Sequence, residues 1–132
     1  MQKIRITSEH VPEPPPELWS NCLVVGDSVY IAGLTARNWG EEASGGAYEQ
    51  ARRIFEKMSR LMTAAGGAMN DMVKLTIFVT DITQNTEVWR ARKEFFTGDF
   101  PACSLVQVAA LARPDISIEI EGFARLGCSS KD

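Results

Sequence analysis

One amphipathic segment near the middle of the 132-residue chain places the strongest constraint on its fold. Between residues 47 and 65 the apolar side chains recur every three or four positions, which puts them on one stripe of a helix. They are Ala47, Ala51, Ile54, Phe55, Met58, Leu61, Met62 and Ala65. Gly66-Gly67 predicts the end of this helix. Because a helix with a single apolar stripe must bury it against another layer, the chain needs a sheet or further helices beside it.

Patterns typical of β-strands supply that layer. Residues 73–80 alternate between a strongly apolar face and a mostly polar one, which predicts a strand packed on one side. Gly26-Asp27-Ser28 separates two short apolar runs and predicts a hairpin. The further β-prone segments are residues 1–7, 104–108 and 116–124. A second helix is expected over residues 83–98, with Phe95 and Phe96 directed inward.

The order of these elements predicts an α+β fold. The length falls inside the range of one domain, so residues 1–132 are expected to form a single domain with two helices on one face of one sheet. The other face would then expose Phe78 beside the polar Thr76, Glu119 and Glu121. A half-apolar sheet surface in water is an association site, so we expect another copy of the chain to bury it.

The residue types present exclude several kinds of site. The single histidine, His10, lies in a proline-rich stretch where nothing fixes its geometry, so neither a histidine-based triad nor a histidine-rich metal site is expected. The three cysteines form no C-x-x-C pair and are expected to be free thiols in a reducing compartment. Gly66-Gly67 follows a helix, whereas a phosphate-binding loop precedes one. We therefore predict no metal and no cofactor.

Charge and hydropathy bear on partners and location. The net charge is -3, with 14 basic and 17 acidic residues, and the scattered basic residues argue against nucleic-acid binding. The longest apolar runs are too short to span a bilayer, so no membrane partner is expected. No charged segment followed by an apolar one opens the chain, which favours a cytoplasmic protein without a cleaved leader.

Residues that can carry chemistry occur in three places. Glu119 and Glu121 share one face of the last expected strand. Either both are solvated carboxylates on an edge strand, or one of them is a general acid or base. Cys103, at a strand start, is either a small buried hydrophobe or part of a cleft. Core packing and the apolar wall of a pocket explain the tryptophans equally well. These tryptophans are Trp19, Trp39 and Trp89.

Motifs along nearly the whole chain point to a known family. They are Trp19-Ser20-Asn21 before residues 27–33, the helix end at residues 64–67 before residues 71–81, Phe95-Phe96, Pro101-Ala102-x-Ser104 and residues 118–121. In this order and spacing they resemble the Rid family, the reactive intermediate deaminases. The resemblance implies a chorismate-mutase-like (ferredoxin-like) subunit with a mixed β-sheet and two helices on one face. Three subunits would form a homotrimer around a central β-barrel, with ligand clefts between subunits.

The resemblance also implies an activity. Members of the family hydrolyse enamines and imines, an arginine after a Pro-Ala pair binds the substrate carboxylate, and a glutamate of the last strand positions the attacking water. By this resemblance Glu119 is the expected catalytic residue. Cys103 stands at the arginine position and has no charge for a bidentate carboxylate contact. Arg37, in the loop after Gly33, is a candidate to replace that charge, although a solvated loop arginine is the commoner outcome.

The remaining cleft positions are more apolar than those usual in the family: Trp19 replaces a tyrosine, Ala32 a serine, Leu34 a glutamine and Trp89 an asparagine. The expected substrate-binding residues are Cys103, Leu105, Trp19, Asn21, Ala32, Leu34, Trp89 and Arg37. Two functions stay open: a cofactor-independent hydrolase of C=N bonds with altered substrates, and a non-catalytic trimer that binds a small molecule in the intersubunit cleft. Ribonuclease activity ranks third, because the acidic balance offers no phosphate-binding surface.

Overall fold

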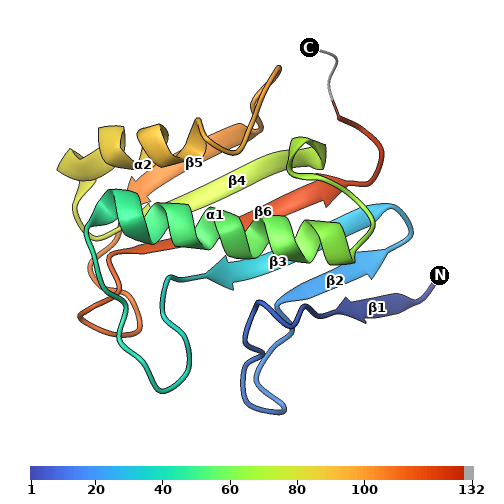
Figure 1. Ribbon diagram of the computed structural model, residues 1–132, viewed down its shortest axis with the longest axis horizontal. Helices are drawn as coiled ribbons and strands as arrows, with labels where there is room; N and C mark the ends of the chain where they lie inside the picture. The colour runs from blue at the N-terminus through green and yellow to red at the C-terminus, as the bar shows by residue number, and fades with distance from the viewer. Residues whose placement is uncertain (130–132) are drawn as a thin grey trace.

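A six-stranded sheet forms one layer of the molecule and two α-helices form the other, in a computed structural model that describes residues 1–129 (Figure 1). The strands are β1 (Lys3–Ile6), β2 (Cys22–Val25), β3 (Ser28–Leu34), β4 (Met72–Val79), β5 (Ala102–Gln107) and β6 (Ile118–Arg125). They lie in the order β1-β2-β3-β6-β4-β5, with the β4–β5 pair parallel and the other pairs antiparallel. The predicted α+β class with a mixed sheet is confirmed. Residues 130–132 of the expected domain lie outside the described residues.

Helix α1 (Ala47–Ala64) carries the apolar stripe that the sequence predicts. Its buried residues are Gln50, Ala51, Ile54, Phe55, Met58, Leu61 and Met62. The helix ends as expected, because Gly66 takes a positive φ of 89°. The Gly67 N–H then donates to the carbonyl of Met62, and the Gly66 N–H donates to that of Thr63. These two bonds satisfy carbonyls that a helix end otherwise leaves unpaired.

The second helix is shorter than the sequence predicts. Helix α2 spans Asn85–Arg92, whereas the expected helix continued to Gly98. Beyond Arg92 the chain tightens into turns, in which two N–H groups donate to carbonyls three residues back. Phe96 still reaches the core, with its ring centroid 5.9 Å from that of Phe55. Its expected inward position is confirmed, but a turn rather than a helix delivers it.

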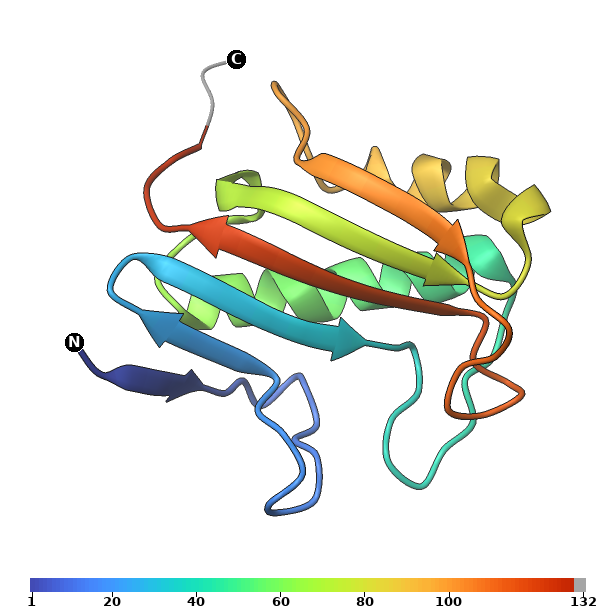
Figure 2. The ribbon, with the colours of Figure 1, turned by 180° about the vertical axis from the view of Figure 1, so that it is seen from behind.

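Both helices cover the same face of the sheet, and the opposite face is bare (Figure 2). Strand β6 lies between β3 and β4, so the edge-strand alternative for Glu119 and Glu121 is wrong. Ile118 and Ile120 are buried in the main core, which turns the two glutamates to the bare face.

Apolar side chains stand on that bare face. Tyr30 of β3 is 49% exposed and packs edge-on against Phe123 of β6, with the ring centroids 5.1 Å apart. Val106 of β5 is 42% exposed. The half-apolar surface expected from the sequence is therefore present.

Strand β3 contains a bulge close to its end. Between Ile31 and Leu34 its register with β6 slips, so that Ala32 and Gly33 together stand opposite Glu121. A bulge of this kind bends the strand and re-aims the neighbouring side chains. It lies where β3 stops and β6 begins, and this is the end of the sheet that carries the candidate site.

The loop after β3 is anchored at several points. Ala36 and Ala43 pack with Ile116 in a small cluster separate from the main core. The Ala43 N–H donates to the carboxylate of Asp115 at 2.6 Å. Because Ile116 belongs to this cluster, β6 begins only at Ile118, two residues later than the sequence predicts.

Candidate functional site

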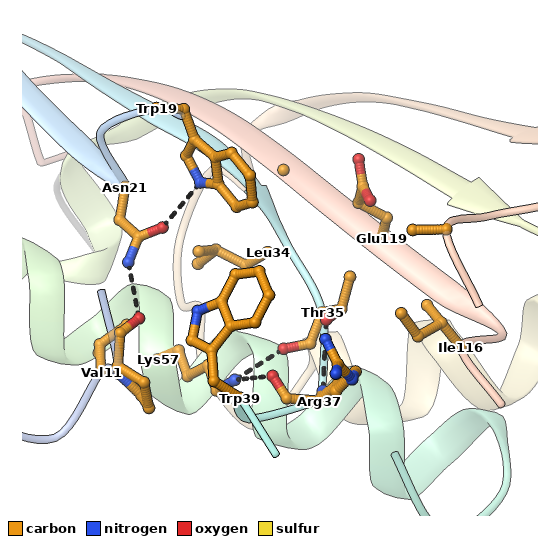
Figure 3. Close-up of a pocket in the computed structure, with 13 residues that line it drawn as sticks. Val11, Trp19, Asn21, Leu34, Thr35, Arg37, Trp39, Lys57, Ile116 and Glu119 are labelled. Atoms are coloured by element: carbon orange, nitrogen blue, oxygen red, sulfur yellow. Dashed lines mark hydrogen bonds between the residues drawn. The ribbon is translucent and has the colours of Figure 1, made fainter. Parts of the chain in front are cut away.

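A cavity of about 140 Å³ opens at this end of the sheet, beside the loop (Figure 3). It brings together five of the nine residues that the sequence assigns to the site: Trp19, Asn21, Leu34, Arg37 and Glu119. Its lining is completed by Val11, Pro12, Gly33, Thr35, Trp39, Lys57, Ala112 and Ile116. The volume lies below the range typical of drug-sized ligands and suits a small metabolite.

Glu119 supplies the carboxylate of this cavity. Its side chain leaves the bare face of β6 and lies against Gly33, where a Cβ atom would stand only 2.3 Å from Oε2. Burial, and to a smaller extent the charge of Glu121, raises the pKa of Glu119 above its ordinary value. A raised pKa brings a carboxyl closer to the range in which it can both accept and return a proton near neutral pH.

Two tryptophans form one wall of the cavity. The rings of Trp19 and Trp39 have centroids 6.0 Å apart and planes tilted by 41°. Their exposed fractions are 46% and 44%, so neither belongs to the core. Of the two explanations for the tryptophans, the pocket wall is confirmed for this pair. Trp89, which is 40% exposed on α2, contributes neither to the core nor to this wall.

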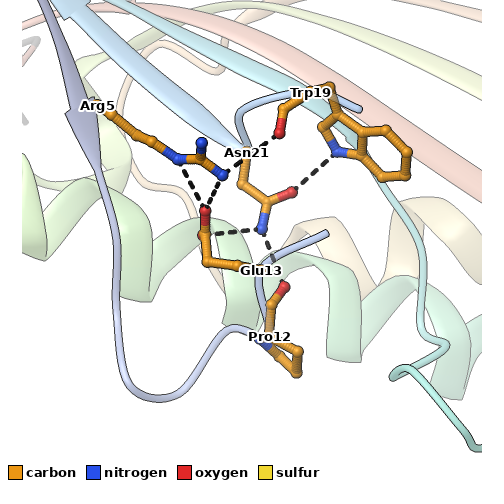
Figure 4. Close-up of polar contacts among 5 residues, drawn as sticks. All are labelled: Arg5, Pro12, Glu13, Trp19 and Asn21. Atoms are coloured by element: carbon orange, nitrogen blue, oxygen red, sulfur yellow. Dashed lines mark hydrogen bonds and ion pairs between the residues drawn. The ribbon is translucent and has the colours of Figure 1, made fainter. Parts of the chain in front are cut away.

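A polar network holds Trp19 in place (Figure 4). The indole Nε1 donates to Oδ1 of Asn21 at 3.2 Å. The Asn21 amide donates in turn to the Pro12 carbonyl at 3.0 Å and to Oε2 of Glu13 at 3.2 Å. Nε of Arg5, on β1, donates to Oε1 of the same glutamate at 3.0 Å. The proline-rich N-terminal segment is therefore fastened to the site through Asn21, which is 5% exposed.

Two cationic side chains line the cavity. Nζ of Lys57 donates to the carbonyls of Thr35 at 2.9 Å and Arg37 at 3.0 Å, and burial lowers the pKa of this lysine. Nε of Arg37 donates to the carbonyl of Glu41 at 3.0 Å. The Arg37 guanidinium also lies over the Trp39 ring, 5.2 Å from its centroid. Lys57 thus fastens the loop to α1, and Arg37 extends the tryptophan wall.

Four predicted site residues lie elsewhere in the chain. Cys103 and Leu105 pack against the main core from β5, the edge strand on the far side of β4 from β6. Trp89 lies on α2. Ala32 lies in the bulge of β3, where its N–H donates to the Asn21 carbonyl at 2.9 Å. Within one chain, the position of the expected arginine is therefore not next to the expected glutamate.

Eight of the thirteen residues that line the cavity were not among the predicted site residues. Nothing in the sequence marks Thr35 or Lys57, because only the return of the loop onto α1 brings them to the cavity. Gly33 carried a usable signal, since a glycine at the end of an apolar run often marks a bulge or a close approach. Trp39 stands out in the sequence only as one of three tryptophans that could form a wall.

The polar groups that line the cavity are few. The side chains supply one carboxylate, two cations, one amide, one hydroxyl and two indole N–H groups, which together can bind an anion and move a proton. Among residues 1–129, no cluster of three or more histidine, cysteine, aspartate or glutamate side chains could hold a metal ion. In this part of the chain there is also no helix with the length and apolar character needed to cross a membrane.

Fold and site together define a class: small α+β proteins with helices on one face of a mixed sheet and a partly buried carboxylate in a cavity at the end of that sheet. Solved structures of similar chains share the fold. PA3499 of Pseudomonas aeruginosa, a protein of unknown function, is 35% identical with a TM-score of 0.89, each chain covered to 99%. RidA from the Antarctic bacterium Psychrobacter sp. is 29% identical with a TM-score of 0.84, covering 93% of this chain and 99% of that one.

Sequence comparisons identify the family. The family profile described as Endoribonuclease L-PSP matches residues 12–126. A 2-iminobutanoate/2-iminopropanoate deaminase of Dermatophagoides farinae is 32% identical over 125 residues, which cover 93% of this chain and 97% of that protein. The human protein of the same name is 33% identical over 111 residues, 83% of this chain and 80% of its own. The chain therefore belongs to the Rid family.

Proposed function

We propose that this protein hydrolyses the C=N bond of reactive imines and enamines and releases a carbonyl compound and ammonia. The observation that carries the proposal is the Glu119 carboxylate, which lies partly buried over Gly33 in a cavity walled by tryptophan rings. Relatives named 2-iminobutanoate/2-iminopropanoate deaminase share about a third of their residues with this chain, which supports a reaction of this type. The structure of Escherichia coli TdcF with bound serine, 27% identical with a TM-score of 0.83, supports a ligand of amino-acid size.

The reaction needs one group that moves protons. As the oxygen of water bonds to the imine carbon, Glu119 accepts one water proton and passes it to the nitrogen, which gives a carbinolamine. Glu119 then moves the hydroxyl proton to the same nitrogen, the C–N bond breaks, and ammonia leaves behind a carbonyl group. The raised pKa of Glu119 suits both transfers, because the carboxyl must be basic enough to take the proton and acidic enough to return it.

The proposed active unit is a homotrimer with its clefts between subunits. The bare sheet face, with Tyr30 and Phe123, is the surface that a neighbouring copy would cover. Cys103, Leu105 and Trp89 lie away from the Glu119 cavity of their own chain. In the proposed trimer they would face the cavity of a neighbour and complete it.

An altered substrate range follows from Cys103. At the position where the resemblance places an arginine, this side chain offers no cation to a carboxylate. A hydrogen bond to a charged group contributes about 1.5–3 kcal/mol, so a small aliphatic imino acid, which has no ring to pack on the tryptophan wall, should bind roughly tenfold or more weakly than in a cleft that has this arginine in addition to the cations of the cavity. We therefore propose that small aliphatic imino acids are poor substrates.

The test is a deamination assay with imines generated in situ from amino acids by an amino-acid oxidase. The purified protein should accelerate release of ammonia from at least one imine. Glu119→Gln should lower that acceleration by about 100-fold or more, because general acid–base catalysis contributes on this order. Glu42→Gln, an exposed glutamate of the loop, is the matched control and should leave the rate unchanged.

Two results would count against the proposal. Full activity in Glu119→Gln removes the glutamate from the mechanism. No acceleration with any imine, together with recovery of a bound ligand unchanged after long incubation, favours the non-catalytic binding protein instead.

A further inference from the structure

We infer that Arg37 binds the carboxylate of the ligand in the Glu119 cavity and that this ligand is an aromatic 2-imino acid, a molecule with both a planar ring and a carboxylate. The imine part of this statement rests on the proposed function. The carboxylate and the ring rest on Arg37 and on the tryptophan pair alone. The carboxylate anchor, Arg37, would thus come from the same chain as Glu119, from a loop rather than from the strand position that Cys103 occupies.

Arg37 is held more firmly than a solvated loop arginine. Its backbone N–H donates to Oγ1 of Thr35 at 3.3 Å, and its carbonyl accepts from Nζ of Lys57 at 3.0 Å. Nε donates to the Glu41 carbonyl at 3.0 Å, and Cζ of the guanidinium lies over the Trp39 ring, 5.2 Å from its centroid. These contacts fix the chain on both sides of the residue and fix one edge of the guanidinium.

The other edge of the guanidinium remains available. Among residues 1–129, neither Nη1 nor Nη2 of Arg37 has a hydrogen-bond partner, although the side chain lines the cavity and is only partly exposed. Two parallel N–H groups on a planar guanidinium match the two oxygens of a carboxylate. Nε already donates to the Glu41 carbonyl, and the guanidinium already lies over the Trp39 ring. Little side-chain freedom of Arg37 is therefore lost when a carboxylate binds.

The charge of the cavity favours an anion. Its charged lining consists of Arg37, Lys57 and Glu119, so it carries one net positive charge when the glutamate is ionised and two when it is protonated. Lys57 uses two of its three ammonium donors on backbone carbonyls and keeps one. Arg37 is therefore the cation that offers a ligand a parallel pair of donors, whereas Lys57 has a single one left.

The tryptophan pair favours a planar ring beside that carboxylate. Trp19 and Trp39 both line the cavity, and nearly half of the surface of each residue is exposed to solvent (Figure 3). Exposed aromatic surface of this size is stabilised when another ring packs on it at a centroid distance of about 4.5–7 Å. Leu34 and Ile116 add apolar surface to the same cavity. A short aliphatic side chain would leave most of this surface in water.

Binding of unreactive analogues tests the inference without any turnover. Titration calorimetry on the parent protein would compare 3-phenylpropanoate with 3-phenylpropanamide, which lacks the charge, and with butanoate, which lacks the ring. We expect 3-phenylpropanoate to bind at least tenfold more tightly than either. Arg37→Gln should abolish the preference over the amide, Arg37→Lys should retain part of it, and Arg60→Gln, an exposed arginine of α1, should retain all of it. A thermal melt of each variant shows whether it is folded.

Several outcomes separate this inference from the proposed function. Equal affinity for acid and amide, or a preference that survives in folded Arg37→Gln, overturns the anchor; equal affinity for butanoate overturns the aromatic class. Turnover in the parent of the imine from phenethylamine, faster than that from L-phenylalanine, would overturn the carboxylate requirement while leaving imine hydrolysis intact. Selective binding of 3-phenylpropanoate without turnover of any imine would leave the anchor standing and reject the deaminase.

Discussion

The Glu119 carboxylate lies against the backbone of Gly33, and the three atoms closest to a Cβ built at residue 33 all belong to that glutamate, the nearest at 2.3 Å. Gly33 has no left-handed backbone conformation, so its need for glycine comes from this contact. Gly33→Ala should push the flexible carboxylate aside. We expect kcat/KM for imine hydrolysis to fall about tenfold or more, because misplacement of a catalytic group by about an ångström has effects of this order. The free energy of unfolding should change by less than about 1 kcal/mol.

A double variant shows whether the glutamate is the obstacle. In a Glu119→Ala background the three atoms nearest to the added methyl group are absent, so Gly33→Ala should have little further effect on unfolding by urea or on residual activity. Gly46→Ala serves as the control, since its Cβ would meet Glu49 at an ordinary 3.4 Å. A loss of several kcal/mol in both backgrounds would instead point to a clash with the backbone.

The pH dependence of stability should reveal the raised pKa of Glu119. A carboxyl with a higher pKa in the folded state holds its proton more tightly there, so its ionisation destabilises the fold as pH rises from the ordinary value of 4.5 through the folded pKa. Glu119→Gln removes this penalty. The variant should gain stability relative to the parent between about pH 4 and pH 7, measured by urea unfolding. Glu42→Gln is the control, and a Glu119→Gln difference that is flat or shrinks with pH would contradict a raised pKa.

Most of the fold follows from short-range patterns in the sequence. The stripe of α1 and the alternation of β4 and β6 are periodicities of the residues themselves, and Gly66-Gly67 ends α1 where expected. The errors lie where tertiary contacts override such patterns. Helix α2 stops at Arg92 and reaches Phe96 through a turn.

The site could be predicted only in part, because its geometry depends on register and on loop packing. The family resemblance singles out Glu119, and composition singles out the tryptophans. The bulge that brings Gly33 beneath the carboxylate is a slip in strand pairing, which the glycine at the end of an apolar run can signal but whose register no local pattern encodes. Likewise, only the folding of the loop onto α1 shows that Lys57 lines the cavity and that Arg37 lies over Trp39.

Asn21 should be the residue that fixes the position of Trp19. Asn21→Ala leaves the indole N–H and the Pro12 carbonyl without their partners, which should lower the free energy of unfolding by about 1–3 kcal/mol. Time-resolved fluorescence should also show a more mobile tryptophan. Asn70→Ala is a control of similar kind, because Asn70 makes two hydrogen bonds to Thr97 far from the cavity. If both variants leave the fluorescence of Trp19 unchanged, Asn21 does not position it.

Cys22 should be the unreactive cysteine of the folded protein. Burial, and secondarily the charge of Glu13, raises its pKa to about 11, so at about pH 8 it remains a buried thiol. Treatment with iodoacetamide at that pH, followed by mass spectrometry, should modify the exposed Cys128 and spare Cys22. In urea all three cysteines should react. Rapid labelling of Cys22 in the folded protein would mean that β2 opens far more readily than its place in the core implies.

The bare sheet face should hold the trimer together. Light scattering at micromolar concentration is expected to give a mass of about 44 kDa, three times the 14.6 kDa of one chain. Phe123→Arg places a charge beside Tyr30 on the bare face and should shift the mass toward that of a monomer, because burying an unpaired charge is costly. Thr63→Arg, on the exposed side of α1, should leave the mass unchanged. A parent protein that is monomeric at this concentration would refute the trimer, and with it the contribution of Cys103 and Trp89 to a neighbour's cleft.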